Sequence, residues 1–315
     1  MNSRWWSFGR DRTPPPRPSG LWPAAPAAPL QRLSAPKVVV IGNEKGGAGK
    51  TTFASLISVA MLYRGARVAA IDLDLRQSSL GRFLANRRRW VQSAGAHAPM
   101  PLEFKLSENT DELSRTAPAG IIGLFEEAIT LAMRNADIVV IDTPGGDTPV
   151  SRAAHLQADV VVTPMNDSFV DFDVLGVVDP LTLDLVRPSH YARVVHDARR
   201  TRTVYGRQLD WVVMPNRLAP TEARNRERLQ RDLQALARQV GFRIGPSLSE
   251  RVIYRELFPF GLTIADLSPQ IKPIKVTAPR EAVKSEMQAL LEAVGLANIA
   301  FDRAPFQPHP GLHPR

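Results

Sequence analysis

The chain has 315 residues, with 40 Lys and Arg against 31 Asp and Glu, and it contains no cysteine. The absence of cysteine excludes disulfide frameworks, thiolate metal sites, cysteine nucleophiles and iron–sulfur clusters. No apolar run approaches the roughly 18 residues of a membrane span. We therefore expect a cytoplasmic protein that does not contact membranes.

The two ends of the chain differ in composition from the rest. Eight of the 27 prolines lie in residues 1–36, which carry a net charge of +4, and residues 303–315 are also rich in proline. Such segments cannot bury enough apolar surface to fold alone, so we expect a disordered arm and a disordered tail. The overall charge is +9, but residues 37–302 hold only +3 of it. Net charge is therefore no argument for nucleic-acid binding.

Strands and helices are predicted to alternate through residues 37–302. Short apolar runs, typical of strands buried in a parallel sheet, lie at residues 37–41, 68–71, 138–141, 160–162 and 211–214. Helical patterns lie at residues 50–64, 122–135, 221–240 and 280–294. This alternation predicts one α/β domain with a doubly wound, mostly parallel sheet flanked by helices. Ligands of such folds bind at the carboxyl ends of the strands.

A glycine-rich loop follows the first predicted strand. It reads GNEKGGAGKTT from Gly42 to Thr52 and opens the predicted helix 50–64. The glycines let backbone N–H groups approach phosphate oxygens, and the helix N-terminus adds partial positive charge. We expect Lys50 to reach the β- and γ-phosphates and the Thr51 hydroxyl to ligate Mg²⁺. The pattern predicts a P-loop.

Lys45 distinguishes this loop from the ordinary one. The usual pattern has its first glycine at position 44, where this chain has glutamate, and Lys45 comes immediately before Gly46 and Gly47. For geometric reasons Lys45 and Lys50 cannot easily both contact the γ-phosphate that is bound in their own subunit. It can reach a γ-phosphate across a face-to-face dimer.

Two later segments place carboxylates at strand ends. Asp72 and Asp74 follow one apolar run, and Asp142 follows another. By position Asp74 is expected to orient or activate the attacking water, with Asp72 supporting it or the metal. A lone aspartate at such a place also fits a helix cap, but two acids favour the site. Asp142 has the Walker B position and is expected to hold Mg²⁺, usually through water.

Together these motifs resemble the deviant Walker A ATPases of the ParA/MinD family. Later segments, within residues 189–200, 210–220 and 252–259, look like its MipZ branch of division-plane positioning ATPases. The resemblance spans about residues 37–300. It implies ATP and Mg²⁺ as cofactors, ATP hydrolysis and an ATP-dependent homodimer.

The resemblance also implies roles for individual residues. The implied ATP contacts are Glu44, Lys45, Gly46, Gly47, Ala48, Gly49, Lys50, Thr51, Thr52, Asn216 and Arg217. Thr51 and Asp142 would hold the metal, and Lys45, Asp72 and Asp74 would be catalytic. Thr143, Pro144 and Gly145 would form the switch that senses the γ-phosphate.

MipZ dimers bind DNA nonspecifically, interact with the centromere-binding protein ParB and oppose assembly of the division protein FtsZ. The resemblance therefore implies a nucleoid-associated protein concentrated toward the cell poles. Three arginines share one face of the predicted helix 221–240 and are candidate DNA contacts: Arg224, Arg228 and Arg231. A second group of candidates is Arg193, Arg199, Arg200, Arg202 and Arg207. From composition alone, the same helix would be interpreted as a solvated face with internal ion pairs.

Two other functions remain open at this point. One is a ParA-type ATPase that partitions chromosomes or plasmids. The other is a metabolic P-loop ligase, in which Lys45 would bind a small substrate. ATP turnover that depends on a metabolite would favour the ligase.

Overall fold

The protein is described here from a computed structural model. The structure describes residues 31, 33–94, 98–106, 118–166, 169–179, 185–218, 223–249, 252–267 and 280–301. Residues 1–30 and 303–315, which include most of the predicted arm and the whole predicted tail, lie outside the described residues.

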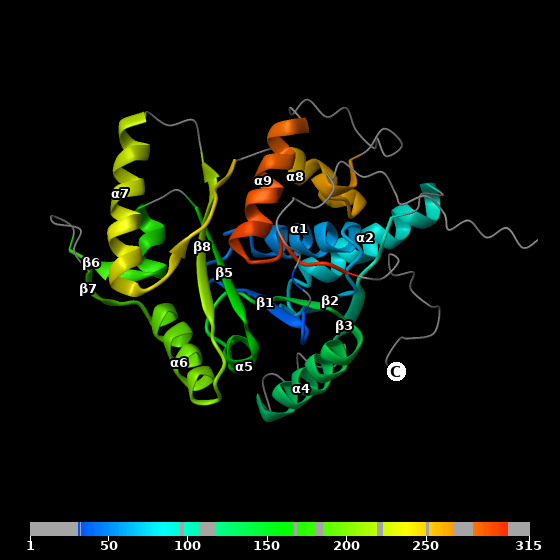
Figure 1. Cartoon of the computed structure of the whole chain (residues 1–315), viewed down its shortest axis with the longest axis horizontal. Helices are drawn as coiled ribbons and strands as arrows, with labels where there is room; N and C mark the ends of the chain where they lie inside the picture. The colour runs from blue at the N-terminus through cyan, green and yellow to red at the C-terminus, as the bar shows by residue number, and fades with distance from the viewer. Residues whose placement is uncertain are drawn as a thin grey trace, which may run out of the picture.

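The centre of the fold is an eight-stranded sheet in which all described pairings are parallel (Figure 1). Its strands run in the order β10-β8-β5-β1-β4-β2-β3, and β9 also pairs with β8. Their bounds are β1 Lys37–Ile41, β2 Val68–Asp72, β3 Leu102–Lys105, β4 Ile138–Asp142, β5 Val160–Asn166, β8 Asp210–Leu218, β9 Arg243–Ile244 and β10 Leu248–Ser249. After β4 the chain crosses to the other side of β1. The carboxyl end of β1 is therefore the topological switch point, where ligands of such sheets bind.

Two apolar cores lie on the two faces of this sheet, because successive strand residues point to opposite sides. Val39 and Ile41 of β1 face the first core, and Val38 and Val40 face the second. The first core packs against α1 (Lys50–Tyr63), α2 (Ser79–Ala94), α8 (Val252–Leu257) and α9 (Arg280–Ala293). The second packs against α4 (Pro118–Asn135), α5 (Pro149–Gln157), α6 (His190–Val204) and α7 (Ala223–Val240). Figure 1 shows α1, α2 and α9 on one side and α4, α5 and α6 on the other.

The predicted fold class is confirmed, and the predicted strands and helices are all present. The apolar runs and helical patterns did not reveal several shorter or more polar elements. These are α2, α5, α6, α8, β3, β9, β10, the antiparallel pair β6 (Gly176–Val178) and β7 (Leu185–Pro188), and the short 3₁₀ turns η1 (Phe169–Val174), η2 (Phe258–Phe260) and η3 (Ile264–Asp266). Most of them have polar outer faces or are only two to six residues long, so tertiary contacts determine them more than local pattern does.

The packed part of the described chain extends upstream of β1. Gln31 pairs with Ile299 as an isolated parallel bridge, and Leu33 packs against the first core. The C-terminal end of the arm expected at residues 1–36 therefore contacts the domain. None of the described helices combines the length and apolar character needed to cross a membrane.

Candidate functional site

The glycine-rich loop connects β1 to α1 at the switch point of the sheet. Gly49 caps α1 with φ = 98°, a left-handed conformation that favours glycine. A Cβ atom there would also lie 2.3 Å from Asn216 Nδ2, so this position has no room for a side chain. The loop thus brings backbone N–H groups to the N-terminus of a 14-residue helix, an arrangement that attracts anions.

Lys50 lies in the first turn of α1 and is mostly buried. Its Nζ donates to the Lys45 carbonyl oxygen at 2.9 Å, so the ammonium lies within the loop itself. Burial lowers the pKa of Lys50, and the nearby Asp142 and Asp74 oppose this shift. A partly desolvated cation at a helix N-terminus is suited to polyphosphate binding.

Asn43 holds the start of the loop, a role that the sequence did not reveal. Its Nδ2 donates to the Pro164 carbonyl oxygen at 2.6 Å, and its Oδ1 accepts from the Lys45 N–H at 2.7 Å. The second contact is an Asx turn, for which an Asn two residues before the donor is the sequence signal. The first contact depends on β5, 121 residues away, and has no local signal.

Asp142 and Thr51 meet beneath the loop in a geometry that fits a divalent cation. The Thr51 hydroxyl donates to Asp142 Oδ2 at 2.7 Å, while the buried Asp142 Oδ1 has no hydrogen-bond partner among the described residues. Burial raises the pKa of Asp142 to about 8, with the nearby Asp72 adding to the shift. Hydroxyl and carboxylate oxygens are ligands that Mg²⁺ prefers, and an added cation would compensate the buried carboxylate.

Asp72 and Asp74 lie together at the end of β2. Asp72 faces Asp142 across the parallel pair β2–β4. Its two carboxylate oxygens accept from the backbone N–H groups of Asp74 (3.0 Å) and Gly81 (2.9 Å). Burial raises its pKa to about 6. Asp74 is half-buried, and its Oδ1 accepts from the Gln77 N–H at 3.0 Å. Asp72 thus braces both the Asp74 backbone and the first helical turns of α2.

We call residues 143–148, between β4 and α5, the switch segment, because they include the predicted switch residues Thr143, Pro144 and Gly145. Its Thr143 donates through both N–H and Oγ1 to the Ile41 carbonyl oxygen, at 3.2 and 2.9 Å. A Cβ atom on Gly145 would lie 3.5 Å from the Glu44 carbonyl oxygen and 3.6 Å from the Gly46 nitrogen. Thr148 caps α5 by accepting from the Ser151 N–H. The segment therefore packs directly against the glycine-rich loop.

Asn216 lies at the carboxyl end of β8. It is 7% exposed, and its Nδ2 donates to the Ala48 carbonyl oxygen at 2.9 Å. The structure thus brings Asn216 next to the glycine-rich loop, 168 residues away in the chain. The side chain of Arg217, the other candidate on β8, lies outside the described set.

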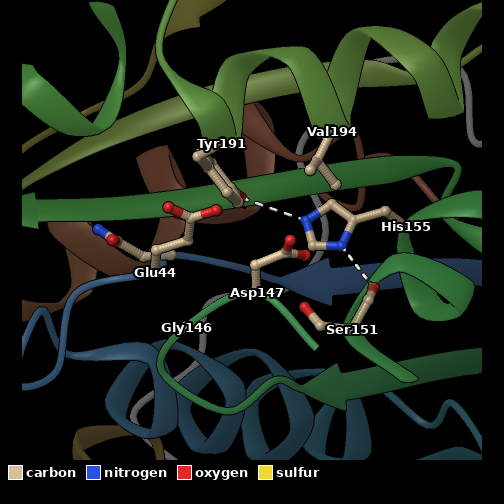
Figure 2. Close-up of a pocket in the computed structure, with 8 residues that line it drawn as sticks. Glu44, Gly146, Asp147, Ser151, His155, Tyr191 and Val194 are labelled. Atoms are coloured by element: carbon tan, nitrogen blue, oxygen red, sulfur yellow. Dashed lines mark hydrogen bonds between the residues drawn. The ribbon is translucent and has the colours of Figure 1, made fainter. Parts of the chain in front are cut away.

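Glu44 and Asp147 extend from the loop and the switch segment (Figure 2), and with His190 they form a charged cluster beside the loop. His190 Nε2 lies 2.7 Å from Asp147 Oδ2 and 3.9 Å from Glu44 Oε1. Both oxygens of Asp147 also accept from Arg152, which is the main cause that lowers the pKa of Asp147 to about 2. Within this cluster the Asp147 carboxylate is thus paired with the Arg152 guanidinium.

The candidate DNA contacts differ in their surroundings. Arg231 of α7 is exposed, and α7 buries Leu233, Leu236 and Val240 on its opposite side. The side chains of Arg224 and Arg228 are outside the described set. In the second group, Arg202 is 4% exposed; it binds Asp159 and donates to the carbonyl oxygens of Gln208 and Leu156. Arg202 therefore braces the end of α6, and its inclusion as a DNA contact was wrong.

Comparison with known proteins agrees with this geometry. A family model described as ATPase MipZ matches residues 37–298. The chain is 25% identical over 230 residues to the maintenance of carboxysome distribution protein A of Halothiobacillus neapolitanus, covering 73% of this chain and 87% of that protein. It is 26% identical over 211 residues to the chromosome-partitioning ATPase Soj of Thermus thermophilus, covering 59% of this chain and 83% of Soj.

A solved structure supports the same fold. It is an ATP complex of a Cyanothece McdA variant with a TM-score of 0.56 and 19% identity, covering 84% of this chain and 98% of that one. The family model covers most of the chain and begins at the first residue of β1. The chain therefore belongs to the MipZ family of ATPases.

Proposed function

We propose that this ATPase is a dimerisation switch that binds DNA nonspecifically and positions the division site by interacting with ParB and inhibiting FtsZ assembly. The observation that carries the proposal is the MipZ family match over residues 37–298. In this proposal ATP bridges two subunits into a dimer, and hydrolysis returns the monomer. The protein would be cytoplasmic, associated with the nucleoid and concentrated toward the poles.

The proposed site uses residues from four segments at the carboxyl edge of the sheet. Residues 44–52 and Asn216 would hold ATP, and Lys50 would neutralise its β- and γ-phosphates. Thr51 and Asp142 would hold Mg²⁺, which supplies charge neutralisation on the phosphate oxygens when it is bound. The backbone contacts that fix Asp74 would let its carboxylate orient the attacking water.

Lys45 carries the dimerisation step of the proposal. Its backbone N–H and carbonyl bind Asn43 and Lys50 within the loop, so removal of the side chain leaves these two contacts in place. We expect Lys45→Ala to bind ATP with affinity within about threefold of wild type but to stay monomeric with ATP. Gel filtration with a slowly hydrolysed analogue checks this, with the exposed Lys105→Ala as control. A dimeric Lys45→Ala protein would show that Lys45 does not act across subunits.

Asp74 carries the hydrolysis step. We expect Asp74→Ala to bind ATP and dimerise but to hydrolyse it about 100-fold more slowly, because the water loses its orienting carboxylate. Asp74→Asn is the matched variant, since its amide oxygen can still accept from the Gln77 N–H. Single-turnover hydrolysis should be slow in both variants. A wild-type rate in Asp74→Asn would mean that Asp74 only stabilises the turn.

Arginines on α7 carry the proposed DNA contact. We expect Arg224→Glu with Arg228→Glu to abolish DNA retention but not ATP-driven dimerisation. Wild-type log affinity should fall with log salt by about 0.9 per phosphate contact, with no dependence on DNA sequence. The control is Arg89→Glu with Arg134→Glu, which makes the same charge change at exposed positions on α2 and α4.

The arginines of the arm could produce DNA binding on their own. A chain that begins at Gln31 removes most of them and keeps the pairing of Gln31 with Ile299. We expect this shorter chain to retain DNA binding. If it loses binding while the α7 double variant retains it, the arm is the DNA element.

A ParA-type partitioning ATPase is the second candidate, because the match to Soj covers 83% of that relative. The two functions differ in their effect on FtsZ. Light scattering of FtsZ assembly, with the ATP-bound Asp74→Ala protein added, distinguishes them. Inhibition supports division-site positioning, and unchanged assembly together with ParB-stimulated ATP hydrolysis supports partitioning.

A further inference from the structure

The first residue of the glycine-rich loop packs against two buried side chains from α5 and α6. A Cβ atom on Gly42 would lie 2.6 Å from the Tyr191 hydroxyl oxygen and 2.7 Å from His155 Nε2. The two rings are buried and meet edge to face, with centroids 5.6 Å apart. A larger residue at position 42 would displace this pair, because protein interiors are close-packed. The pair is therefore in direct contact with the base of the loop.

Tyr191 and His155 belong to a series of linked hydrogen bonds, which we call the hydrogen-bond chain. In this series each member donates a hydrogen bond to the next. Trp211 Nε1–H donates to Thr163 Oγ1 at 2.9 Å, and the Thr163 and Tyr191 hydroxyl oxygens are 3.0 Å apart. The Tyr191 hydroxyl oxygen lies 3.3 Å from His155 Nε2, and His155 Nδ1 lies 2.7 Å from the Ser151 carbonyl oxygen (Figure 2).

The Ser151 carbonyl oxygen fixes the direction of this chain. A carbonyl oxygen can only accept, so His155 Nδ1 carries a proton, and in the neutral ring Nε2 accepts from the Tyr191 hydroxyl. Burial lowers the pKa of His155, which keeps the ring neutral. Thr163 accepts from the indole, so its own proton is left to donate to Tyr191. In this single arrangement every polar side-chain group of the hydrogen-bond chain has a hydrogen-bond partner.

The two ends of this series of hydrogen bonds lie in different elements of the fold. Trp211 is in β8, the strand that ends near Asn216, and Thr163 is in the neighbouring β5. Ser151 is in the first turn of α5, where its N–H donates to the cap residue Thr148 of the switch segment. The hydrogen-bond chain therefore connects the sheet to the start of α5.

The same pair also lines a small pocket between the loop and the switch segment. Asn43 and Glu44 contribute to this pocket from the loop, and Gly146 and Asp147 contribute from the switch segment. Figure 2 shows His155 between Tyr191 and Ser151, with Glu44 and Asp147 beside it. Within this series of hydrogen bonds the Tyr191–His155 bond links α6 to α5, and the Arg202–Leu156 bond links the same two helices near the C-terminus of α5.

We propose that Tyr191 and His155 are positioning residues for ATP hydrolysis. They hold the switch segment in a fixed position relative to the glycine-rich loop. The bond between the Tyr191 hydroxyl and His155 Nε2 fixes the start of α5. Gly42 of the loop packs against the two side chains that form this bond. Nucleotide binding itself uses the loop and Lys50, so loss of the bond affects hydrolysis and spares affinity. This inference rests on the ATPase activity of the family and on no DNA, ParB or FtsZ contact.

The test measures hydrolysis and binding separately. We expect Tyr191→Phe and His155→Leu each to slow single-turnover hydrolysis, per bound ATP, about tenfold, since small misplacements of reacting groups cost rate. The ATP dissociation constant should stay within about twofold of wild type. His155→Gln, whose side-chain oxygen can accept from Tyr191, should restore most of the rate. The measurement is made at protein concentrations high enough that the hydrolysis rate per bound ATP no longer rises with concentration.

Two controls separate positioning from a general structural effect. Tyr205→Phe removes the same hydroxyl at an exposed position that ends α6 and should leave the rate unchanged. The double variant Tyr191→Phe with His155→Leu should lose less rate than the product of the two single losses, because both changes break the same Tyr191–His155 bond. A wild-type rate in Tyr191→Phe would overturn the proposal. So would equal losses of rate and affinity, or a double variant whose loss is the product of the two single losses.

Discussion

Lys50→Ala is expected to weaken ATP binding by about 100-fold or more, because it removes the charge opposite the β- and γ-phosphates. In the structure the Lys50 ammonium already lies 2.9 Å from the Lys45 carbonyl oxygen, within the loop. No other described lysine lies in the glycine-rich loop except Lys45, which we expect to act across subunits. Isothermal titration calorimetry with a slowly hydrolysed ATP analogue measures the effect.

The matched control for this variant is Lys105→Ala. Lys105 is exposed at the end of β3, in the same sheet, and its removal should leave affinity unchanged. Lys50→Ala should also remain folded, because burial already raises the pKa of the neighbouring Asp142 to about 8, so this carboxyl group can stay protonated when the ammonium is absent. Normal ATP affinity in folded Lys50→Ala protein would show that the nucleotide does not bind at this loop.

Asp266→Ala is expected to lower the free energy of unfolding by about 3–5 kcal/mol, because it leaves the Arg87 guanidinium buried without its counter-charge. Both side chains are fully buried. Two hydrogen bonds of 2.7 and 2.9 Å join them, and Arg87 also donates to the carbonyl oxygens of Pro99 and Gly261. Tyr63 donates to Asp266 as well, at 2.8 Å, so the pair ties α1 and α2 to the turns η2 and η3.

Urea denaturation of Asp266→Ala and Arg87→Met tests this ion pair. The double variant should lose less stability than the sum of the two single losses, because it leaves no uncompensated charge. Asp197→Ala breaks the exposed pair with Arg200 and should cost at most about 1 kcal/mol. A loss in Asp266→Ala no larger than that of Asp197→Ala would contradict the buried-pair argument.

The central strands and the glycine-rich loop could be predicted because their signals are local. The apolar run 37–41 and the adjacent glycines define a strand, a turn and a helix start within about fifteen residues, whatever the rest of the chain does. Asp142 and Asp72 follow apolar runs of the same kind, and the parallel register brings them opposite each other. Carboxyl ends of parallel strands meet at one edge of a sheet, so the site could be assembled from sequence.

The supporting contacts could not be predicted, since they join residues far apart in the chain. Arg87 and Asp266 are 179 residues apart, and each alone would be expected on the surface. Arg202 was taken as a surface charge for the same reason. Tyr191 and His155 lie in helices whose sequences show no feature of a nucleotide site, and only the fold brings them to Gly42.

The most direct measurement is the sedimentation of the wild-type chain without nucleotide, with ADP, and with a slowly hydrolysed ATP analogue. A dimerisation switch predicts a monomer in the first two conditions and a dimer with the analogue. The dimer should revert to monomer in Lys45→Ala under the same conditions. A sedimentation coefficient that is the same in all three conditions would contradict ATP-driven dimerisation.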